Sequence, residues 1–449
     1  MKYPNNKVLI KIPPQLDKIF SQQTKLQIGQ NQLSIQRLAD KIIVDKSIKS
    51  DVIQISRQLL MHDNLNASSK VFHQLNYRLM PDKTIRVGPV VGILIAGKES
   101  AGSPPVARRA RVYKELSQKA AAKNIFLYFF YADDFDWQHR LVKGFIYKSG
   151  SGKLHWHKAA FCLPDIVYNR ISYRYKEETE AVQNFMSKAR QASIYLFNSR
   201  FLNKWEVHKS LFNNLQTREF VLETDCYSAA TLKKYLNKYN EFFIKPTASS
   251  VGKGIIKVIA NQPGTIDYFQ WGKSSNWQTC HSYGELFNRL SIPAGDKYIL
   301  QKGIKLASIG KRVFDIRAQV QKDGQGKWQF TGAAVRLAAV GKFVTHVPNG
   351  GSKRDYHLTI NEVFGSGPIT EGLDKQLKNI CRHVPQALEE SLGINLAVLS
   401  IDIGIDRNGH MWIIEVNSKP ASFDETAIHK RHLELLTDYF LFKTNFVIQ

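Results

Sequence analysis

Two carboxylates and one amide side chain lie close together near the end of the sequence, at Asp402, Glu415 and Asn417. The dipeptide Asn408-Gly409 between them is a strong signal for a two-residue β-hairpin turn. Pairing outward from that turn places Asp402 directly opposite Glu415. Because side chains alternate along a strand, Asn417 then lies on the same face as Glu415. The spacing therefore predicts a hairpin face that carries three oxygen-bearing side chains.

A hairpin face of this kind is suited to a divalent cation. Opposed Cβ atoms in an antiparallel pair lie about 5 Å apart, so two carboxylates there repel by roughly 3 kcal/mol at an effective dielectric of about 20. Two carboxylates and an amide oxygen form a donor set for Mg²⁺, which commonly completes its octahedron with substrate phosphates. The alternative is a solvated hairpin face on which two acids occur by chance.

The same register assigns the other hairpin residues. Three further pairs are expected: Arg407 with His410, Ile403 with Ile414, and Asp406 with Met411. Asp406 shares the acidic face but lies about 13 Å along the strand from Asp402, which makes Asp402 the preferred ligand. The opposite face is predicted to pack on a core through its apolar side chains, Ile401, Ile403, Ile405, Trp412, Ile414 and Val416.

Length and composition indicate a globular protein of several domains. The chain has 449 residues, of which 43% are hydrophobic and 11% aromatic, enough for about two to four domains with full cores. Its formal net charge of +25 favours anionic partners, which include nucleotides, nucleic acids, anionic polymers and membrane surfaces.

The cysteines and the apolar segments provide information on the cellular location of the protein. Cys162, Cys226, Cys280 and Cys381 are far apart and form no CxxC pair, which predicts reduced thiols in a cytoplasmic protein. The first twenty residues contain no continuous apolar segment, so no secretory signal is expected. No apolar run approaches about 18 residues, and therefore no membrane span is expected.

The first half of the chain reads as two domains. Residues 1–86 are predicted to form a small β-rich domain, with strands at Lys7–Ile12, Ile42–Val44 and Asp51–Ile55 and a short helix at 56–62. The next domain, 87–200, is predicted to contain a parallel βαβ unit, with strands at Val90–Ala96, Ile125–Tyr131 and Asp165–Asn169 and a helix at Val106–Lys123.

The second half begins near Phe201. Helices are predicted at Lys204–Leu215, with Asn203 as N-cap, and at Ser228–Asn237, Lys375–Leu392 and Asp424–Phe440. Strands are predicted at Glu241–Pro246, Ile255–Ile259, Tyr298–Leu306, Val313–Gln321 and Trp328–Ala338. The small-residue loop Thr247–Gly254 is able to lay its backbone N–H groups over phosphates. Asp315 and Arg317 share a strand face, where a structural ion pair and a substrate role both remain open.

The order of these motifs resembles the ATP-grasp superfamily. A lysine at a helix start (Lys204) is followed by IKP before the small-residue loop, then YILQ (298–301), DIR (315–317), Arg336, an NGG loop (349–351) and D-x12-E-V-N (402–417). The stretches VGPVVGI (87–93) and LPDIVYNR (163–170) resemble the YheC/YheD-type endospore coat-associated branch.

The resemblance implies a mixed α+β and α/β multidomain fold. The small β-rich domain (1–86) would be followed by a Rossmann-like pre-ATP-grasp domain (87–200) and an ATP-grasp domain (201–449). The latter would have two lobes, at about 201–300 and 301–449, that grip ATP between them.

The resemblance also implies site residues, carried over position by position. Nucleotide contacts would come from Lys204, Lys245, Ser249, Ser250, Gly252 and Gly254 at the phosphates and from Gln301, Lys302, Gly303 and Ile304 at adenine. Catalytic roles would fall to Arg336, Lys245 and Arg317, and Mg²⁺, or alternatively Mn²⁺, would bind Asp402, Glu415 and Asn417. Many members carry an acid at the position of Lys302 and another soon after it for the ribose, whereas no acid occurs here from Lys302 to Phe314.

The resemblance implies an ATP-dependent ligase that joins a carboxylate to an amine or another nucleophile through an acyl phosphate, in spore coat or cell-envelope formation during sporulation. The basic residues Lys353 and Arg354 and the net charge suggest an anionic or polymeric substrate. One alternative is a catalytically inactive ATP-grasp scaffold of the spore coat. A second is a basic nucleic-acid-binding protein, which no RNP-like or helix-turn-helix motif supports. The sequence predicts no oligomeric state.

Overall fold

The structure is a computed structural model that describes residues 9–35, 41–62, 72–96, 110–150, 153–249, 252, 254–261, 264–274, 276–340, 351–421, 423 and 425–446. The chain forms two compact units. The first comprises Met1–Arg200, Lys322–Lys327 and Ser422–Gln449, and the second comprises Phe201–Gln321 and Trp328–Ala421. Mixed sheets in the first unit, antiparallel strand pairs in the second and helices on the sheets of both confirm the predicted fold class.

The first unit begins with a seven-stranded sheet of short strands in the order β3-β2-β8-β7-β5-β1-β4. Its strands are β1 (Ile10–Ile12), β2 (Lys25–Ile28), β3 (Asn31–Ser34), β4 (Ile42–Val44), β5 (Val52–Ser56), β7 (Phe72–Leu79) and β8 (Thr84–Gly88). Two short helices, α1 (Asp17–Gln22) and α2 (Arg57–Leu60), interrupt them.

A second sheet in the same unit has the order β14-β13-β9-β10-β11-β12-β6. The strands are β6 (Met61–His62), β9 (Val90–Leu94), β10 (Phe126–Asp136), β11 (Leu141–Gly150), β12 (Lys153–Cys162), β13 (Ile166–Asn169) and β14 (Tyr195–Phe197). Strands β9 and β10 are parallel and are joined through α3 (Ala110–Ala122), which confirms the predicted βαβ unit. The helices α4 (Arg174–Glu177) and α5 (Glu180–Gln191) lead from β13 to β14.

The C-terminal helix α11 (Thr426–Lys443) belongs to the first unit rather than to the part of the chain that precedes it. The Tyr439 ring packs edge-on against Phe197, and its hydroxyl lies 2.9 Å from that of Tyr195. Among the described residues, no helix is long and apolar enough to cross a membrane.

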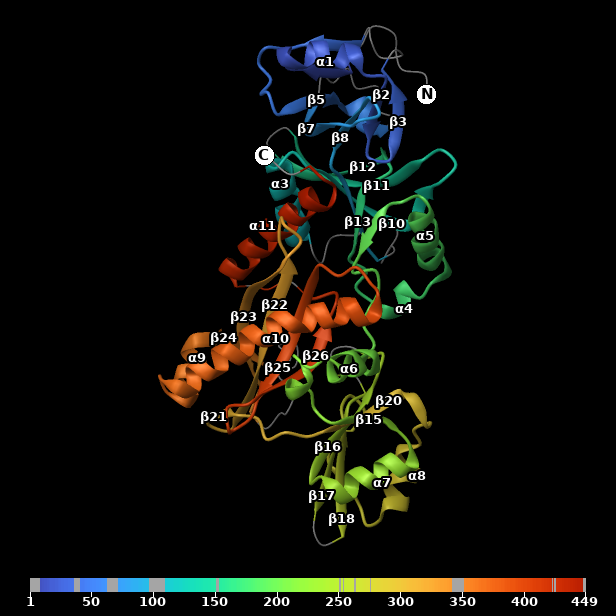
Figure 1. Cartoon of the computed structure of the whole chain (residues 1–449). Helices are drawn as coiled ribbons and strands as arrows, with labels where there is room; N and C mark the ends of the chain where they lie inside the picture. The colour runs from blue at the N-terminus through green and yellow to red at the C-terminus, as the bar shows by residue number, and fades with distance from the viewer. Residues whose placement is uncertain are drawn as a thin grey trace. The chain divides into compact units, whose positions relative to one another are not determined.

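The second unit starts with a six-stranded sheet in the order β15-β20-β16-β17-β18-β19. The strands are β15 (Thr224–Tyr227), β16 (Glu241–Pro246), β17 (Ile256–Asn261), β18 (Thr265–Gln270), β19 (Gln278–Cys280) and β20 (Gly295–Lys302). The helices α7 (Ala229–Lys238) and α8 (Tyr283–Leu290) lie together on one side of it (Figure 1). Strand β20 ends at Lys302, four residues before the predicted end at Leu306.

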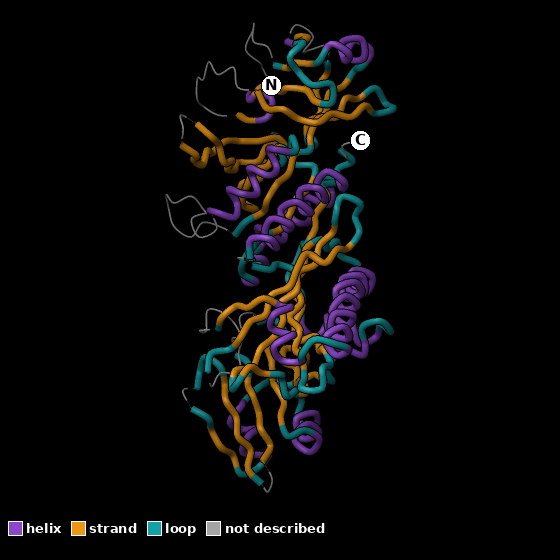
Figure 2. The backbone as a smooth tube through the Cα atoms, turned by 90° about the vertical axis from the view of Figure 1, so that its left-hand side faces the viewer, coloured by secondary structure: helices purple, strands orange, loops and turns teal. Residues whose placement is uncertain are grey.

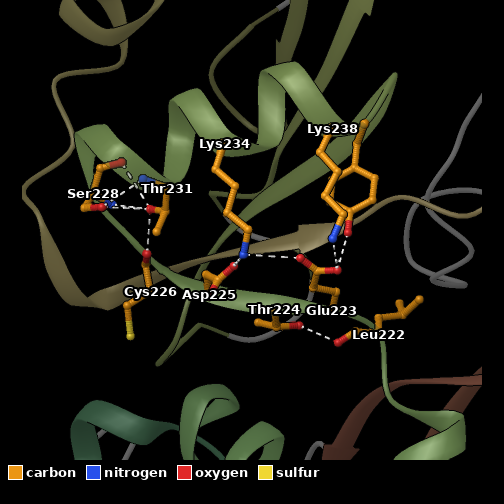
Figure 3. A network of polar contacts seen from close by, with 10 residues as sticks. Leu222, Glu223, Thr224, Asp225, Cys226, Ser228, Thr231, Lys234 and Lys238 are labelled. Carbon is orange, nitrogen blue, oxygen red and sulfur yellow. Dashed lines mark hydrogen bonds and ion pairs between the residues drawn. The ribbon is translucent and has the colours of Figure 1, made fainter.

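A polar network fixes α7 to β15 (Figure 3). Lys234 bridges Asp225 and Glu223, at 2.8 and 3.3 Å, and Lys238 contacts Glu223 at 2.7 Å. Although burial raises the pKa of Glu223, hydrogen bonds from Lys238 and Tyr239 lower it to about 2. Ser228 caps α7 together with Thr231.

The other sheet of the second unit has the order β24-β23-β22-β25-β26. Its strands are β22 (Arg312–Lys322), β23 (Trp328–Leu337), β24 (Ser352–Asp355), β25 (Val398–Ile405) and β26 (Met411–Asn417), and the short β21 (Ser308–Ile309) pairs with β22. The helices α9 (Tyr356–Phe364) and α10 (Pro368–Leu392) lie along it (Figures 1 and 2). The predicted apolar stripe of α10 is buried at Leu377, Ile380, Val384 and Leu388.

Candidate functional site

A cavity of about 390 Å³ lies in the second unit, and strands of both its sheets line it. The apolar lining residues are Leu222, Phe243, Ile255, Ile304, Leu306, Val313 and Ile414. The charged and polar ones are Lys204, Glu241, Lys245, Lys257, Gln301, Lys302, Lys305, Asp315, Arg336, Asp402, Arg407 and Glu415. Seven of these are cationic and four are acidic, so the cavity favours an anionic ligand such as a polyphosphate.

The strand period explains how β16 supplies the cavity. Phe242 and Ile244 are fully buried in the core on one face of the strand, so the alternate residues Glu241, Phe243 and Lys245 point into the cavity on the other. Lys245, which was predicted to contact the phosphates, is thus directed into the cavity by an alternating apolar pattern that ends at Pro246.

Lys204 reaches the cavity from the first turn of α6 (Lys204–Asn213). The side chain of Asn203 caps this helix by accepting from the backbone N–H groups of Trp205 and Glu206, as predicted. Lys204 Nζ lies 3.2 Å from Glu415 Oε1 and donates to the carbonyl of Ser249 at 2.6 Å. This lysine therefore connects the small-residue loop to the acidic hairpin.

Lys245 is 8% exposed and donates to Gln301 Oε1 at 2.5 Å. Burial lowers the pKa of Lys245 to about 8, with Lys204 acting in the same direction and Glu415 opposing it. A polyphosphate beside this ammonium would favour its charged form.

Nucleotide affinity is therefore expected to depend on pH. As the pH rises through about 8, the empty protein loses the Lys245 charge, so binding should take up a proton and weaken about tenfold per pH unit above 8. Calorimetry of ATP binding in buffers of different ionisation enthalpy measures this uptake. The Lys245→Arg variant, which stays charged, should show neither effect, and a wild-type affinity independent of pH from 7 to 9.5 would contradict the expectation.

The hairpin brings the predicted acidic pair together. Asp402 lies opposite Glu415 across β25 and β26, as the register argument predicted, and Ser400 lies opposite Asn417. Asp402 is 2% exposed, whereas Glu415 and Asn417 are half-buried. Asn417 shares the face of Glu415 but is not one of the residues that line the cavity, so its part in a metal site remains a prediction.

The turn itself differs from the prediction in two ways that cancel. The loop has three residues, Arg407 to Gly409, because Asp406 rather than Arg407 pairs with His410. Gly409 has a φ of 77°, which a residue with a side chain rarely adopts. An extra residue at Ile414 then shifts the register of β26 by one, so that Asp402 and Glu415 come opposite each other after all.

The three-residue loop also changes which face of β26 is buried between the turn and the bulge. Trp412 and Ile414 were predicted in the core, whereas Met411 and Ile413 occupy it and Ile414 lines the cavity. Asp406, predicted opposite Met411, instead accepts from the backbone N–H groups of Asn408 and His410 and from Trp412 Nε1. It thus stabilises the turn.

Arg336 lies at the centre of a buried charge network. It forms a bidentate pair with Asp315, at 2.7 and 2.8 Å, and its Nη2 lies 3.0 Å from Asp402 Oδ2. Although burial acts against the charged form, Asp402 and Asp315 hold the pKa of Arg336 above its ordinary value. Among the described residues, the buried Nη1 atom of Arg336 has no hydrogen-bond partner, so one donor remains available to an anion.

Arg317 joins the same network from the neighbouring strand. It pairs with Asp402 in the register of β22 and β25, with Nε 3.5 Å from Asp402 Oδ1, and its Nη2 donates to Ser400 Oγ. The ion pair considered for Asp315 and Arg317 is thus replaced by two pairs, Asp315 with Arg336 and Arg317 with Asp402.

The segment predicted to contact adenine, Gln301 to Ile304, lies beside the cavity. The Gln301 side chain is bound to Lys245, and the backbone N–H groups of Lys302 and Gly303 donate to the carbonyls of Glu223 and Glu241. Those two N–H groups are therefore committed within the sheet. Adenine recognition by this segment stays a prediction for its remaining groups.

The loop after β16 is only partly described. Gly252 and Gly254 have φ values of 74° and 76°, which require glycine, and the Ser249 hydroxyl donates to the carbonyl of Pro246. Ser250 lies outside the described residues. The phosphate contacts predicted for this loop remain predictions.

Several cavity residues were missed by the sequence analysis, above all Glu241, Lys257, Lys305 and Arg407. Two of them carried a signal. Glu241 shares the β16 face with Lys245, and Lys257 lies opposite Phe243 on the next strand. Lys305 and Arg407 lie in connections whose course the strand pattern does not predict.

The acidic pair fits a divalent cation by its chemistry. Asp402 and Glu415 are opposed oxygen donors, and each already contacts a cation of the protein, Arg336 and Lys204 respectively. Carboxylate oxygens are ligands that Mg²⁺ prefers, and a metal bound there would displace these two protein cations.

The amino-acid sequence is similar to those of known proteins. Residues 193–442 match the family model described as YheC/D-like ATP-grasp. The endospore coat-associated protein YheD of Bacillus subtilis (strain 168) is 26% identical over 82% of this chain and 82% of its own length. YheC of the same organism is 24% identical over 62% of this chain and 76% of its own length. The solved VanG D-Ala:D-Ser ligase from Enterococcus faecalis aligns with 79% of this chain and 98% of its own, at 13% identity and a TM-score of 0.45. Because the family model covers more than half of the chain, this protein belongs to the YheC/D-like ATP-grasp family, which confirms the predicted resemblance.

Proposed function

We propose that this protein is an ATP- and Mg²⁺-dependent ligase that activates a carboxylate as an acyl phosphate and transfers the acyl group to an amine or another nucleophile. The observation that carries the proposal is the opposed pair Asp402 and Glu415 in one cavity with Lys204, Lys245 and Arg336. Oxygen donors for a metal and cations for phosphates occur there within contact distance of one another.

The reaction has two displacements. A carboxylate oxygen of the substrate attacks the γ-phosphorus of ATP, and the bond between that phosphorus and the bridging oxygen of ADP breaks. The nucleophile then attacks the acyl carbon, the C–O bond to phosphate breaks, and the amine releases a proton. No side-chain nucleophile is required, because positioning and electrostatic stabilisation supply the acceleration.

Each charged residue has a defined task in this scheme. Lys204 and Lys245 hold the phosphates, and the available Nη1 donor of Arg336 stabilises the charge on the transferring phosphoryl oxygens. Arg317 keeps Asp402 oriented from the neighbouring strand. Mg²⁺ bound at Asp402 and Glu415, with Asn417 as the third proposed ligand, would supply further positive charge and orient the phosphates.

The contacts of the two carboxylates predict coupled binding. Glu415 contacts Lys204 and Asp402 contacts Arg336, so a metal alone must displace protein cations, whereas a metal bound with polyphosphate leaves those cations a new partner. Mn²⁺ should therefore bind at least about tenfold more tightly when ATP or ADP is present. The nucleotide should in turn bind more tightly, by the same factor, when Mn²⁺ is present. Electron paramagnetic resonance of free Mn²⁺ measures both affinities. Equal Mn²⁺ affinity with and without nucleotide would contradict the coupling.

The proposed class of substrate follows from the positive charge of the protein. Lys353 is exposed on β24 beside Arg354, and the cavity carries more cations than acids, so an anionic or polymeric carboxylate is favoured. Because YheD and YheC are named endospore coat-associated, we propose that the protein acts in the cytoplasm on material of the spore coat or cell envelope.

The test uses labelled carboxylates. Purified protein, Mg²⁺ and ATP are incubated with panels of ¹⁸O-carboxylates and amines, and the released phosphate is analysed by mass spectrometry. Attack by the carboxylate predicts one ¹⁸O atom in each phosphate released with the ligated product. Product whose phosphate carries no ¹⁸O would rule out an acyl phosphate.

A further inference from the structure

Glu241 is the cavity acid that lies against the segment predicted to contact adenine. Its carbonyl accepts from the N–H of Gly303 at 2.9 Å. A Cβ atom on Gly303 would lie only 2.7 Å from Glu241 Cγ, so a glycine is needed where the two strands pass. The Glu241 side chain therefore runs directly alongside the end of β20.

The carboxylate of Glu241 is held in a defined position. Lys257 Nζ lies 2.9 Å from Glu241 Oε2, and the two side chains are 15% and 31% exposed, respectively. Both residues line the cavity. One carboxylate thus stays fixed in the cavity while part of it remains open to a ligand.

Strand β16 sets the distance between Lys245 and Glu241 in the cavity. Lys245 and Glu241 lie four residues apart on one strand face, which corresponds to about 13 Å. The ring of Phe243 lies between them, with Lys245 and Lys257 at 5.4 and 5.8 Å from its centroid. A nucleotide whose phosphates contact Lys245 would therefore extend its nucleoside end toward Glu241.

The apolar part of the cavity lining suits a flat, uncharged group. Ile304, Leu306 and Val313 are apolar and line the cavity with Phe243. The segment from Lys302 to Phe314 contains no acid that would accept from a ribose hydroxyl or a base amine. Among the described residues, the cavity's other three acids are Asp315, Asp402 and Glu415, all in the Arg336 and Lys204 clusters.

We propose that Glu241, oriented by Lys257, accepts a hydrogen bond from the nucleoside part of ATP and so replaces the acid absent from the segment after Gln301. This inference rests on the proposed function, because it assumes that the nucleotide occupies this cavity. Glu241 then determines nucleoside specificity, and Lys257 is a positioning residue.

The experiment measures nucleotide binding to the full-length protein by calorimetry with Mg²⁺. Wild type and Glu241→Gln are compared with ATP, 2′-deoxy-ATP, 3′-deoxy-ATP and ITP, which remove in turn the two ribose hydroxyls and the base amine. Glu241→Gln is expected to weaken ATP binding about tenfold or more, since a hydrogen bond to a charged group is lost. The analogue without the donor group should bind both proteins equally, and it identifies the group.

Glu223→Gln is the matched control. Its carboxylate lies outside the cavity, in the network with Lys234 and Lys238 (Figure 3), so this variant should bind all four nucleotides like wild type. Thermal melting checks that both variants are folded.

Two results would overturn the inference while the proposed function stands. In the first, Glu241→Gln binds every nucleotide like wild type although Lys245→Met weakens ATP binding. In the second, the affinity of Glu241→Gln falls by the same factor for all four nucleotides. A wild-type protein that binds no ATP would instead overturn both proposals.

Discussion

Asp402→Asn is expected to abolish magnesium-dependent nucleotide turnover while the protein stays folded. Mutation of a residue that only orients a metal ligand typically lowers metal affinity or activity by about 10- to 100-fold. Loss of a direct ligand should therefore lower the rate of phosphate release by at least about 100-fold. The asparagine keeps an oxygen beside Arg317, and Asp315 still neutralises Arg336. Phosphate release and circular dichroism measure the two parts of this expectation.

Asp406→Asn is the matched control from the same hairpin. Asp406 accepts from the turn and from Trp412 and does not line the cavity, so its variant should melt at a lower temperature yet keep its turnover. Unchanged turnover in Asp402→Asn would contradict the metal assignment. Equal loss in both variants would show that hairpin geometry, rather than ligation, controls activity.

Arg336→Met is expected to cause the largest loss of stability. The variant leaves Asp315 and Asp402 buried without their main counter-charge, and removal of one partner from a buried pair typically costs about 3–5 kcal/mol. Denaturant unfolding followed by tryptophan fluorescence measures the free energy of unfolding.

Arg317→Met provides the comparison. Arg317 is 23% exposed at its side chain and lies 3.5 Å from Asp402, so its loss should cost at most about 1 kcal/mol. If both variants lose the same free energy, Arg336 is not the centre of the network. If Arg336→Met is as stable as wild type, the buried pair contributes no net stability.

The hairpin shows what could and what could not be predicted from the sequence. The pairing of Asp402 with Glu415 followed from the strand period and a glycine turn. The three-residue loop and the bulge at Ile414 were not predictable in the same way, because Asp406 organises the turn through its own hydrogen bonds and a bulge leaves no periodic signal. The correct pair therefore came from two deviations that compensate.

Local patterns predicted local structure well. The bounds of β16 were predicted as observed because an apolar alternation ends there at a proline, and α6 starts at Lys204 because Asn203 caps it. Ion pairs between strands were not predicted, since the strand pattern places Asp315 and Arg336 on neighbouring strands without fixing which side chains meet. The ion pair between Glu241 and Lys257 was not predicted for the same reason.

The affiliation with the ATP-grasp family leaves an active ligase and an inactive scaffold as distinct possibilities for the cavity. They differ in whether the opposed carboxylates still bind a metal with nucleotide.

Calorimetric titration of the full-length protein with Mg²⁺-ATP, for wild type and Glu415→Gln, tests the central claim most directly. The structure predicts saturable, magnesium-dependent binding to wild type, and an affinity at least about tenfold weaker for Glu415→Gln at unchanged thermal stability. Absence of Mg²⁺-ATP binding to wild type, or equal binding to both proteins, would contradict the assignment of this cavity as a magnesium–nucleotide site.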